Sequence, residues 1–116
     1  LDEHSRGVFQ GKVLVEPQSQ KTDGHQLSRT LLLSRSAEMD CKPELEIYAD
    51  DVKCSHGATA GELDESGLFY MRSRGIPEAE ARRLLMGAFV AQTLDKIGDN
   101  AVRDVMARLV ADWMAS

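Results

Sequence analysis

The order of hydrophobic and polar positions along the chain changes character near residue 61. Before that point, short segments with strand-like patterning occur at residues 8–15, 27–33, 44–49 and 52–55. In residues 44–49 apolar and polar positions alternate, which is typical of a half-buried strand. Turn-forming pairs such as Asp-Gly and Lys-Pro separate the segments. The first half of the chain is therefore predicted to be β structure.

In the second half, apolar positions recur at helical spacing. A short helix is predicted over residues 64–73, ending before Gly75, which is a favourable residue just beyond a helix end. A second helix is predicted to begin at Pro77. Asp99 or Asn100 can cap a third helix, whose apolar stripe ends at the single tryptophan.

These patterns predict two regions, residues 1–61 with β structure and residues 62–116 with helices. The irregular spacing of the strands leaves two architectures open, a small antiparallel sandwich fragment or rungs of a β-solenoid. A length of 116 residues allows one domain, or one domain with a short appendage. Because the chain begins with Leu1 rather than Met, we interpret it as a fragment or a processed product.

The charge and composition exclude several classes of partner. The net charge is −5, and acidic side chains outnumber basic ones in both halves, so binding to nucleic acid or to an anionic membrane surface is not expected. No apolar run approaches the roughly 20 residues that span a bilayer. Two cysteines, in a chain without a secretion signal, favour free thiols in a reducing compartment, and hence the cytoplasm.

The densest group of reactive side chains lies at residues 50–57. If the strand there includes Cys54 and His56, both side chains point to one face, because strand side chains alternate. A thiolate and an imidazole suit zinc, iron or an iron–sulphur cluster. Two other interpretations stay open, a packed cysteine beside a hydrogen-bonded histidine, and a thiol enzyme with Cys54 as nucleophile.

Two further segments invite a functional interpretation. The small residues at 57–61 lack the Gly-Lys-Ser/Thr ending of a phosphate-binding loop, so nucleotide binding is not predicted. The basic segment 72–75 lies at a predicted helix end, where positive charge is favourable. That segment is interpreted either as helix-terminal charge or as a docking site for another protein.

Four strings of the sequence are distinctive, at residues 5–12, 20–23, 42–59 and 68–76. The longest of them is KPELEIYADDVKCSHGAT. Together they resemble the C-terminal part of the SufD branch of the SufB/SufD family of iron–sulphur cluster assembly scaffolds. The SufB branch carries His-Glu-Ala-Thr where this chain has His-Gly-Ala-Thr, which favours the SufD branch.

The resemblance implies a fold and a role that the pattern alone does not give. It implies the last rungs of a right-handed parallel β-helix over residues 1–61, followed by a C-terminal helical domain. It also implies a non-enzymatic scaffold that pairs with SufB, or with a second copy of itself, and docks the SufC ATPase. A transient cluster would form at the partner interface, with no stably bound cofactor, and there His56 is the implied metal ligand and Cys54 a second candidate.

The helical region is the part that the resemblance associates with SufC. The residues expected to contact a partner are those around the first predicted helix end, namely Phe69, Tyr70, Arg72, Arg74, Gly75 and Ile76. The alternative is a purely structural interaction module, in which His56 and Cys54 are packing residues and hold no cluster.

Overall fold

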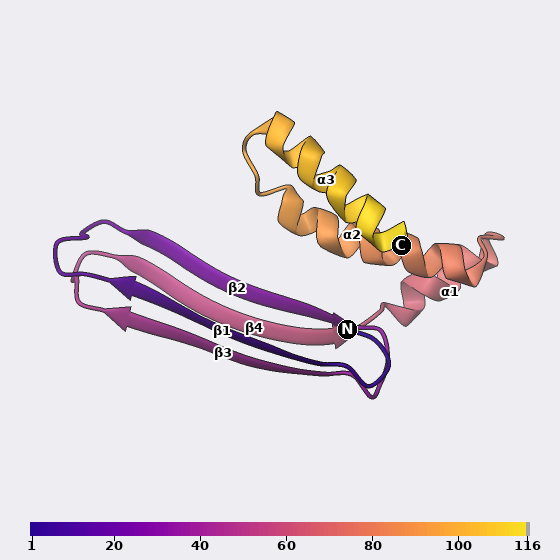
Figure 1. Ribbon diagram of the computed structural model, residues 1–116, viewed down its shortest axis with the longest axis horizontal. Coiled ribbons are helices and arrows are strands. Elements are labelled where there is room, and N and C mark those ends of the chain that lie inside the picture. Colours follow the sequence, from indigo (N-terminus) through magenta and orange to yellow (C-terminus); the bar gives the residue numbers. More distant parts are fainter. Residues whose placement is uncertain (116) are drawn as a thin grey trace. The chain divides into compact units, whose positions relative to one another are not determined.

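The computed structural model of the chain describes residues 1–115 and contains four strands followed by three helices (Figure 1). The strands are β1 (Arg6–Val15), β2 (Asp23–Leu32), β3 (Glu38–Ile47) and β4 (Lys53–Glu62). The helices are α1 (Glu65–Ser73), α2 (Glu78–Leu94) and α3 (Asn100–Ala115). The chain divides into two compact units, Leu1–Glu62 and Leu63–Ser116, called here the β unit and the helical unit. The predicted order, strands first and helices after, is confirmed.

Every second strand of the β unit pairs in parallel. Strand β1 pairs with β3, so that Arg6 is opposite Glu38, and β2 pairs with β4, so that Asp23 is opposite Lys53. The two sheets therefore have two strands each, with offsets of 32 and 30 residues along the chain. Figure 1 shows β1 and β3 running one way and β2 and β4 the other. Since all pairings are parallel, the antiparallel sandwich is excluded as a description of this unit.

Each strand has an inner face, turned toward the other sheet, and an outer face. Alternate residues of β1 and β2 are half-buried, and the half-buried sets approach each other across the unit. A Cβ on Gly24 would lie 3.9 Å from Val13 Cγ1, and Ser28 Oγ lies 3.5 Å from Cys41 Sγ. The alternation of the sequence thus separates inner from outer residues, as strand geometry requires.

The strands are longer than the sequence pattern predicts. The pairs Asp23-Gly24 and Lys42-Pro43, expected as turns, lie inside β2 and β3, and residues 57–61 continue β4. Pro43 lacks an N–H group, but within residues 1–115 β3 pairs with β1 alone, so a missing donor on the other edge of β3 breaks no pairing. Polar residues such as Asp23 occupy outer, exposed positions, which is why an apolar pattern did not reveal them.

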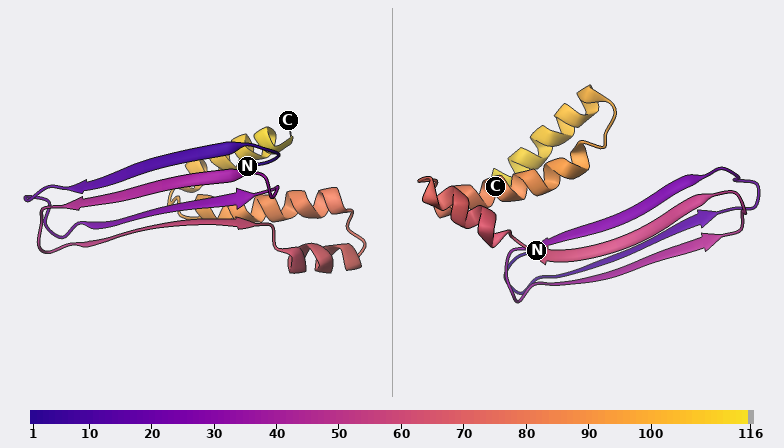
Figure 2. Two further views of the ribbon diagram at one scale, coloured as in Figure 1. Left: turned by 90° about the horizontal axis from the view of Figure 1, so that it is seen from below. Right: turned by 180° about the vertical axis from the view of Figure 1, so that it is seen from behind.

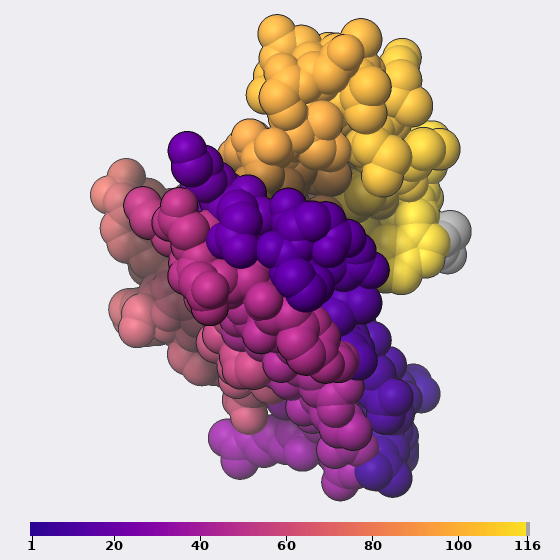
Figure 3. Space-filling model, turned by 90° about the vertical axis from the view of Figure 1, so that its left-hand side faces the viewer, coloured from indigo at the N-terminus to yellow at the C-terminus, as the bar shows by residue number. Residues whose placement is uncertain are grey.

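The turns that join the strands are hydrogen-bonded to each other at one end of the β unit. Lys21 N donates to Asp51 O at 2.6 Å, and Asp51 N donates to Gln20 Oε1 at 2.9 Å. In Figure 3 these turns, residues 16–22 and 48–52, face the viewer side by side. These hydrogen bonds hold the loop at residues 16–22 and the loop at residues 48–52 in register with each other.

The helices of the helical unit begin and end where local chemistry directs. Asp64 caps α1 by accepting a hydrogen bond from Ser66 N, and Gly75, with φ of +87°, follows the end of α1 as predicted. Pro77 is the residue before α2 rather than its first residue. Asp99 Oδ1 accepts from Val102 N at 3.1 Å, which caps α3. None of the helices in residues 1–115 is long and apolar enough to cross a bilayer.

Helices α2 and α3 lie side by side and run in opposite directions (Figure 2). The apolar stripe predicted for α3 exists, but most of it is exposed in this chain. Val102 is 50% exposed, Leu109 58% and Trp113 75%. The stripe therefore does not form a closed core with α2 within the described residues.

Candidate functional site

Strand β4 carries both residues of the candidate site. Cys54 and His56 lie two positions apart on it, and their register partners on β2 are Gly24 and Gln26. Gly24 and Gln26 belong to the half-buried, inner set of β2, so Cys54 and His56 occupy the inner face of β4. Cys54 is half-buried, and the side chain of His56 is exposed.

The two side chains are chemically available. Cys54 is a free thiol, and for residues 1–115 the structure gives no hydrogen bond or ion pair to Cys54 Sγ or to the His56 ring. Among those residues there is also no group of three or more His, Cys, Asp or Glu side chains placed to hold a metal ion. The described chain thus offers two donors of soft and borderline character, fewer than the four that a closed metal site uses.

A second histidine, His25, is engaged on the outer face of β2. Its Nδ1 lies 2.6 Å from Ser55 Oγ, and its Nε2 lies 2.8 Å from Asp23 Oδ1. Sequence patterns gave His25 no role, because one of its two partners, Ser55, lies on a strand 30 positions away. The Asp23 and His25 side chains are 68% and 62% exposed, so this chain of contacts lies in solvent and links β2 to β4.

The second cysteine lies inside the β unit. Cys41 lies within β3, opposite Phe9 of β1, and its Sγ contacts Ser28 Oγ at 3.5 Å. The adjacent Lys42-Pro43 pair, predicted as a turn, instead continues the strand. Cys41 and Cys54 are both free thiols.

Ion pairs cover the outer face of β1 and β3. Arg6 pairs with Asp40, and Lys42 Nζ lies 2.9 Å from Glu44 Oε1. The hydrogen bond and charge of Lys42 hold the pKa of Glu44 below its ordinary value, and Glu44 raises the pKa of Lys42 in return. Hydrogen bonding to Asp40 raises the pKa of Arg6. These pairs show that the outer face is a solvated surface. Cys54 and His56, the two side chains of the candidate site without partners among residues 1–115, lie on the inner face instead.

The predicted partner segment, residues 69–76, has an exposed aromatic group. Phe69 is 75% exposed and Tyr70 58%, and the Arg74 guanidinium lies 4.7 Å from the centroid of the Tyr70 ring. Arg72 Nη1 lies 3.3 Å from Glu78 Oε2, which ties the end of α1 to the start of α2. Ile76 is half-buried, and its N–H donates to Met71 O at 3.2 Å. The segment thus presents rings and cations from a hydrogen-bonded helix end.

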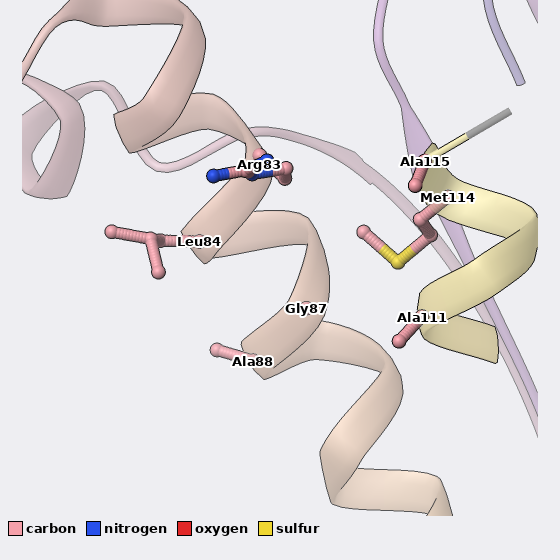
Figure 4. A pocket seen from close by; sticks show the side chains of 7 residues that line it. All are labelled: Arg83, Leu84, Gly87, Ala88, Ala111, Met114 and Ala115. Carbon is pink, nitrogen blue, oxygen red and sulfur yellow. The ribbon is translucent and has the colours of Figure 1, made fainter. Parts of the chain in front are cut away.

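A groove lies between α2 and α3, and no sequence pattern predicted it. Its volume is about 460 Å³, and small and apolar side chains line most of it (Figure 4). Figure 4 shows Met114 and Ala111 of α3 pointing toward Gly87 of α2. The small residues of α2 leave this space open, and their spacing in the sequence is the signal that could have revealed it.

Comparison with known proteins identifies the family. Residues 1–89 match the family model described as SUF system FeS cluster assembly, SufBD core domain. The chain is 44% identical to the iron–sulfur cluster assembly protein SufD of Escherichia coli, over 94% of this chain and 26% of that protein. It is 50% identical to an iron–sulfur cluster assembly SufBD family protein of Synechocystis, over 84% of this chain and 21% of that protein.

A third relative is a plant protein. The chain is 46% identical to the chloroplastic protein ABCI7 of Arabidopsis thaliana, over 87% of this chain and 22% of that protein. The chain thus spans about a quarter of the length of the curated relatives that it matches. The resemblance to the C-terminal part of SufD, drawn from four strings of residues, is confirmed. This chain belongs to the SufBD family of the SUF system for iron–sulphur cluster assembly.

Proposed function

We propose that this chain is a non-catalytic scaffold segment of a SUF assembly complex, in which His56 binds iron of a nascent cluster at an interface shared with SufB. The observation that carries the proposal is the position of Cys54 and His56. Both lie on the inner face of β4, and neither has a hydrogen-bond partner among residues 1–115. A neutral imidazole near pH 7 is a good iron ligand, and a thiolate two positions away is a second one.

The small number of donors supports a shared site rather than a self-contained one. Within residues 1–115 no third side chain joins the pair, whereas iron–sulphur clusters are held by several thiolate or imidazole ligands. The remaining ligands would come from the partner and from the sulphide of the cluster. The cluster is therefore cargo under construction, and the chain retains no cofactor of its own.

We further propose that the β unit is the final part of a right-handed parallel β-helix. Each strand pairs in parallel with the strand two positions later, which is how successive rungs stack. A crossover that joins parallel strands of one sheet is right-handed in about 98% of cases. Each of the four strands has one unpaired edge within the described chain, and these edges can receive earlier rungs on one side and a partner on the other.

The helical unit is proposed as the docking site for the SufC ATPase. The exposed rings of Phe69 and Tyr70, with Arg74 stacked on Tyr70, supply the aromatic and arginine contacts that dominate protein interfaces. ATP hydrolysis would then belong to SufC. Free thiols are consistent with a reducing compartment, and we place the complex in the cytoplasm.

The test is to co-express the full-length protein anaerobically with SufB and SufC, and to measure iron and sulphide in the purified complex. The variants are His56→Ala and, as a matched control, His25→Ala, which removes an exposed imidazole from the outer face of β2. We expect His56→Ala to leave the complex assembled with severalfold less cluster, and His25→Ala to retain the cluster. Unchanged cluster content in the His56→Ala complex would overturn the proposal.

A purely structural interaction module is the second candidate. The observation in its favour is that residues 1–115 hold no complete set of metal ligands. If this candidate is correct, His56→Ala lowers the melting temperature of the complex and leaves its cluster content unchanged. Pairing of the chain with a second copy of itself, instead of with SufB, would appear as a complex that forms without SufB.

A further inference from the structure

Gln26 reaches across the β unit from the inner face of β2. A Cβ on residue 11 would overlap Gln26 Nε2 and would lie 3.0 Å from Gln26 Cδ. The carboxamide is therefore seated directly against the backbone of β1, in space that only a glycine leaves open.

One end of this carboxamide is left without a partner. Gln26 Oε1 is buried and makes no hydrogen bond within residues 1–115. A buried acceptor without a donor is unfavourable, and such groups are rare in native proteins unless they have a purpose. A donor is therefore expected within reach of this oxygen in the working protein.

His56 is placed to provide that donor. It is the register partner of Gln26 in the parallel pairing of β2 with β4. Paired strands lie about 4.7–4.9 Å apart, and their register partners project from the same face. A neutral imidazole carries one N–H group in either tautomer, and the oxygen of an amide is an acceptor. In the structure the two side chains make no hydrogen bond to each other, so a rotation of the exposed His56 side chain is needed to bring its N–H group to Gln26 Oε1. The two groups are complementary, because one lacks a donor and the other lacks an acceptor.

We propose that Gln26 is a positioning residue for His56. Its Oε1 accepts a hydrogen bond from one ring nitrogen of His56, which fixes the tautomer and the orientation of the ring. The other ring nitrogen then keeps its lone pair for iron. The inference rests on the proposed function of His56 as an iron ligand, and it adds the residue that prepares His56 for that role.

The test measures binding of Co²⁺ alone, as a spectroscopic substitute for Fe²⁺, to the assembled complex of the full-length protein. Gln26→Met keeps the length of the side chain and removes the acceptor, while Gln26→Glu keeps an acceptor. The matched control is Gln10→Met, which makes the same change at an exposed position of β1. The His56→Ala complex defines which part of the Co²⁺ absorption depends on His56.

We expect Gln26→Met to weaken the His56-dependent Co²⁺ binding by about 10- to 100-fold, the usual effect of losing a group that supports a metal ligand. Gln26→Glu should bind at least as tightly as the wild type, and Gln10→Met should match the wild type. Binding by Gln26→Met within twofold of the wild type, or equal losses in Gln26→Met and Gln26→Glu, would overturn the inference. If His56→Ala itself leaves Co²⁺ binding unchanged, the proposed function of His56 fails first, and the role of Gln26 fails with it.

Discussion

Replacing Gly11 with alanine should destabilise the β unit, although the change adds a single methyl group. The new Cβ would overlap Gln26 Nε2 and would lie 2.8 Å from Phe9 Cζ, closer than carbon atoms pack. The Gln26 side chain and the Phe9 ring must both leave their preferred rotamers, at about 0.5–1.5 kcal/mol each. The expected loss is therefore about 1–3 kcal/mol, the range typical of overpacked cores.

The assay is urea unfolding of the full-length protein, with the midpoint compared at constant slope. Gly61→Ala is the matched control, because a Cβ on Gly61 of β4 meets no atom within 4 Å. That variant should be neutral or slightly more stable, since alanine restricts the unfolded chain. Adding Gln26→Ala to Gly11→Ala should recover part of the loss, because the main overlap is then gone. A Gly11→Ala variant as stable as Gly61→Ala would refute the packing argument.

Two further predictions concern the helical unit and the outer face. Gly75→Ala should cost about 1 kcal/mol in thermal unfolding, because residue 75 has φ of +87°, whereas Gly98→Ala, in open space, should cost less; equal effects would contradict this. The pKa of Glu44 is lower in the folded than in the unfolded protein. The ion pair of Glu44 with Lys42 therefore contributes fully to the stability of the fold above about pH 4.3, and this stabilisation is lost as the pH falls through the folded pKa. Glu44→Gln should therefore flatten the loss of stability below that pH, and an unchanged pH profile would count against the ion pair with Lys42.

The sequence predicted elements well where a pattern is local. The starts of the three helices and the end of α1 were correct to within a residue or so, because Asp64, Gly75 and Asp99 act on neighbouring backbone groups. The second helix was expected to continue to Ile97, but α2 ends at Leu94. The predicted strand ends were less accurate. Polar residues such as Asp23 lie on the outer face and take part in strand pairing, but they break the apolar pattern from which strands were predicted. Pro43 was misinterpreted as a turn residue because its effect depends on whether the strand has a neighbour on that edge.

In the candidate site, too, the features set by local sequence were predicted, and those set by long-range strand pairing were not. That Cys54 and His56 share one face follows from the alternation of a single strand, and both do lie on β4. The placement of Gln26 beside His56 depends on a parallel pairing between strands offset by 30 residues, which no local pattern encodes. The contact of His25 with Ser55 was missed for the same reason. The role of His56 itself stays a prediction.

The two sheet offsets differ by two residues, and the difference lies in the turns, because residues 48–52 are fewer than residues 16–22 while all four strands are equally long. One residue inserted into a strand would move the rest of its side chains to the opposite face, but a turn absorbs a change in length without that effect. Evolutionary insertions and deletions in this family should therefore collect in these turns. For the same reason, a peptide tag or fluorophore introduced near Pro17 should leave the strand faces unchanged.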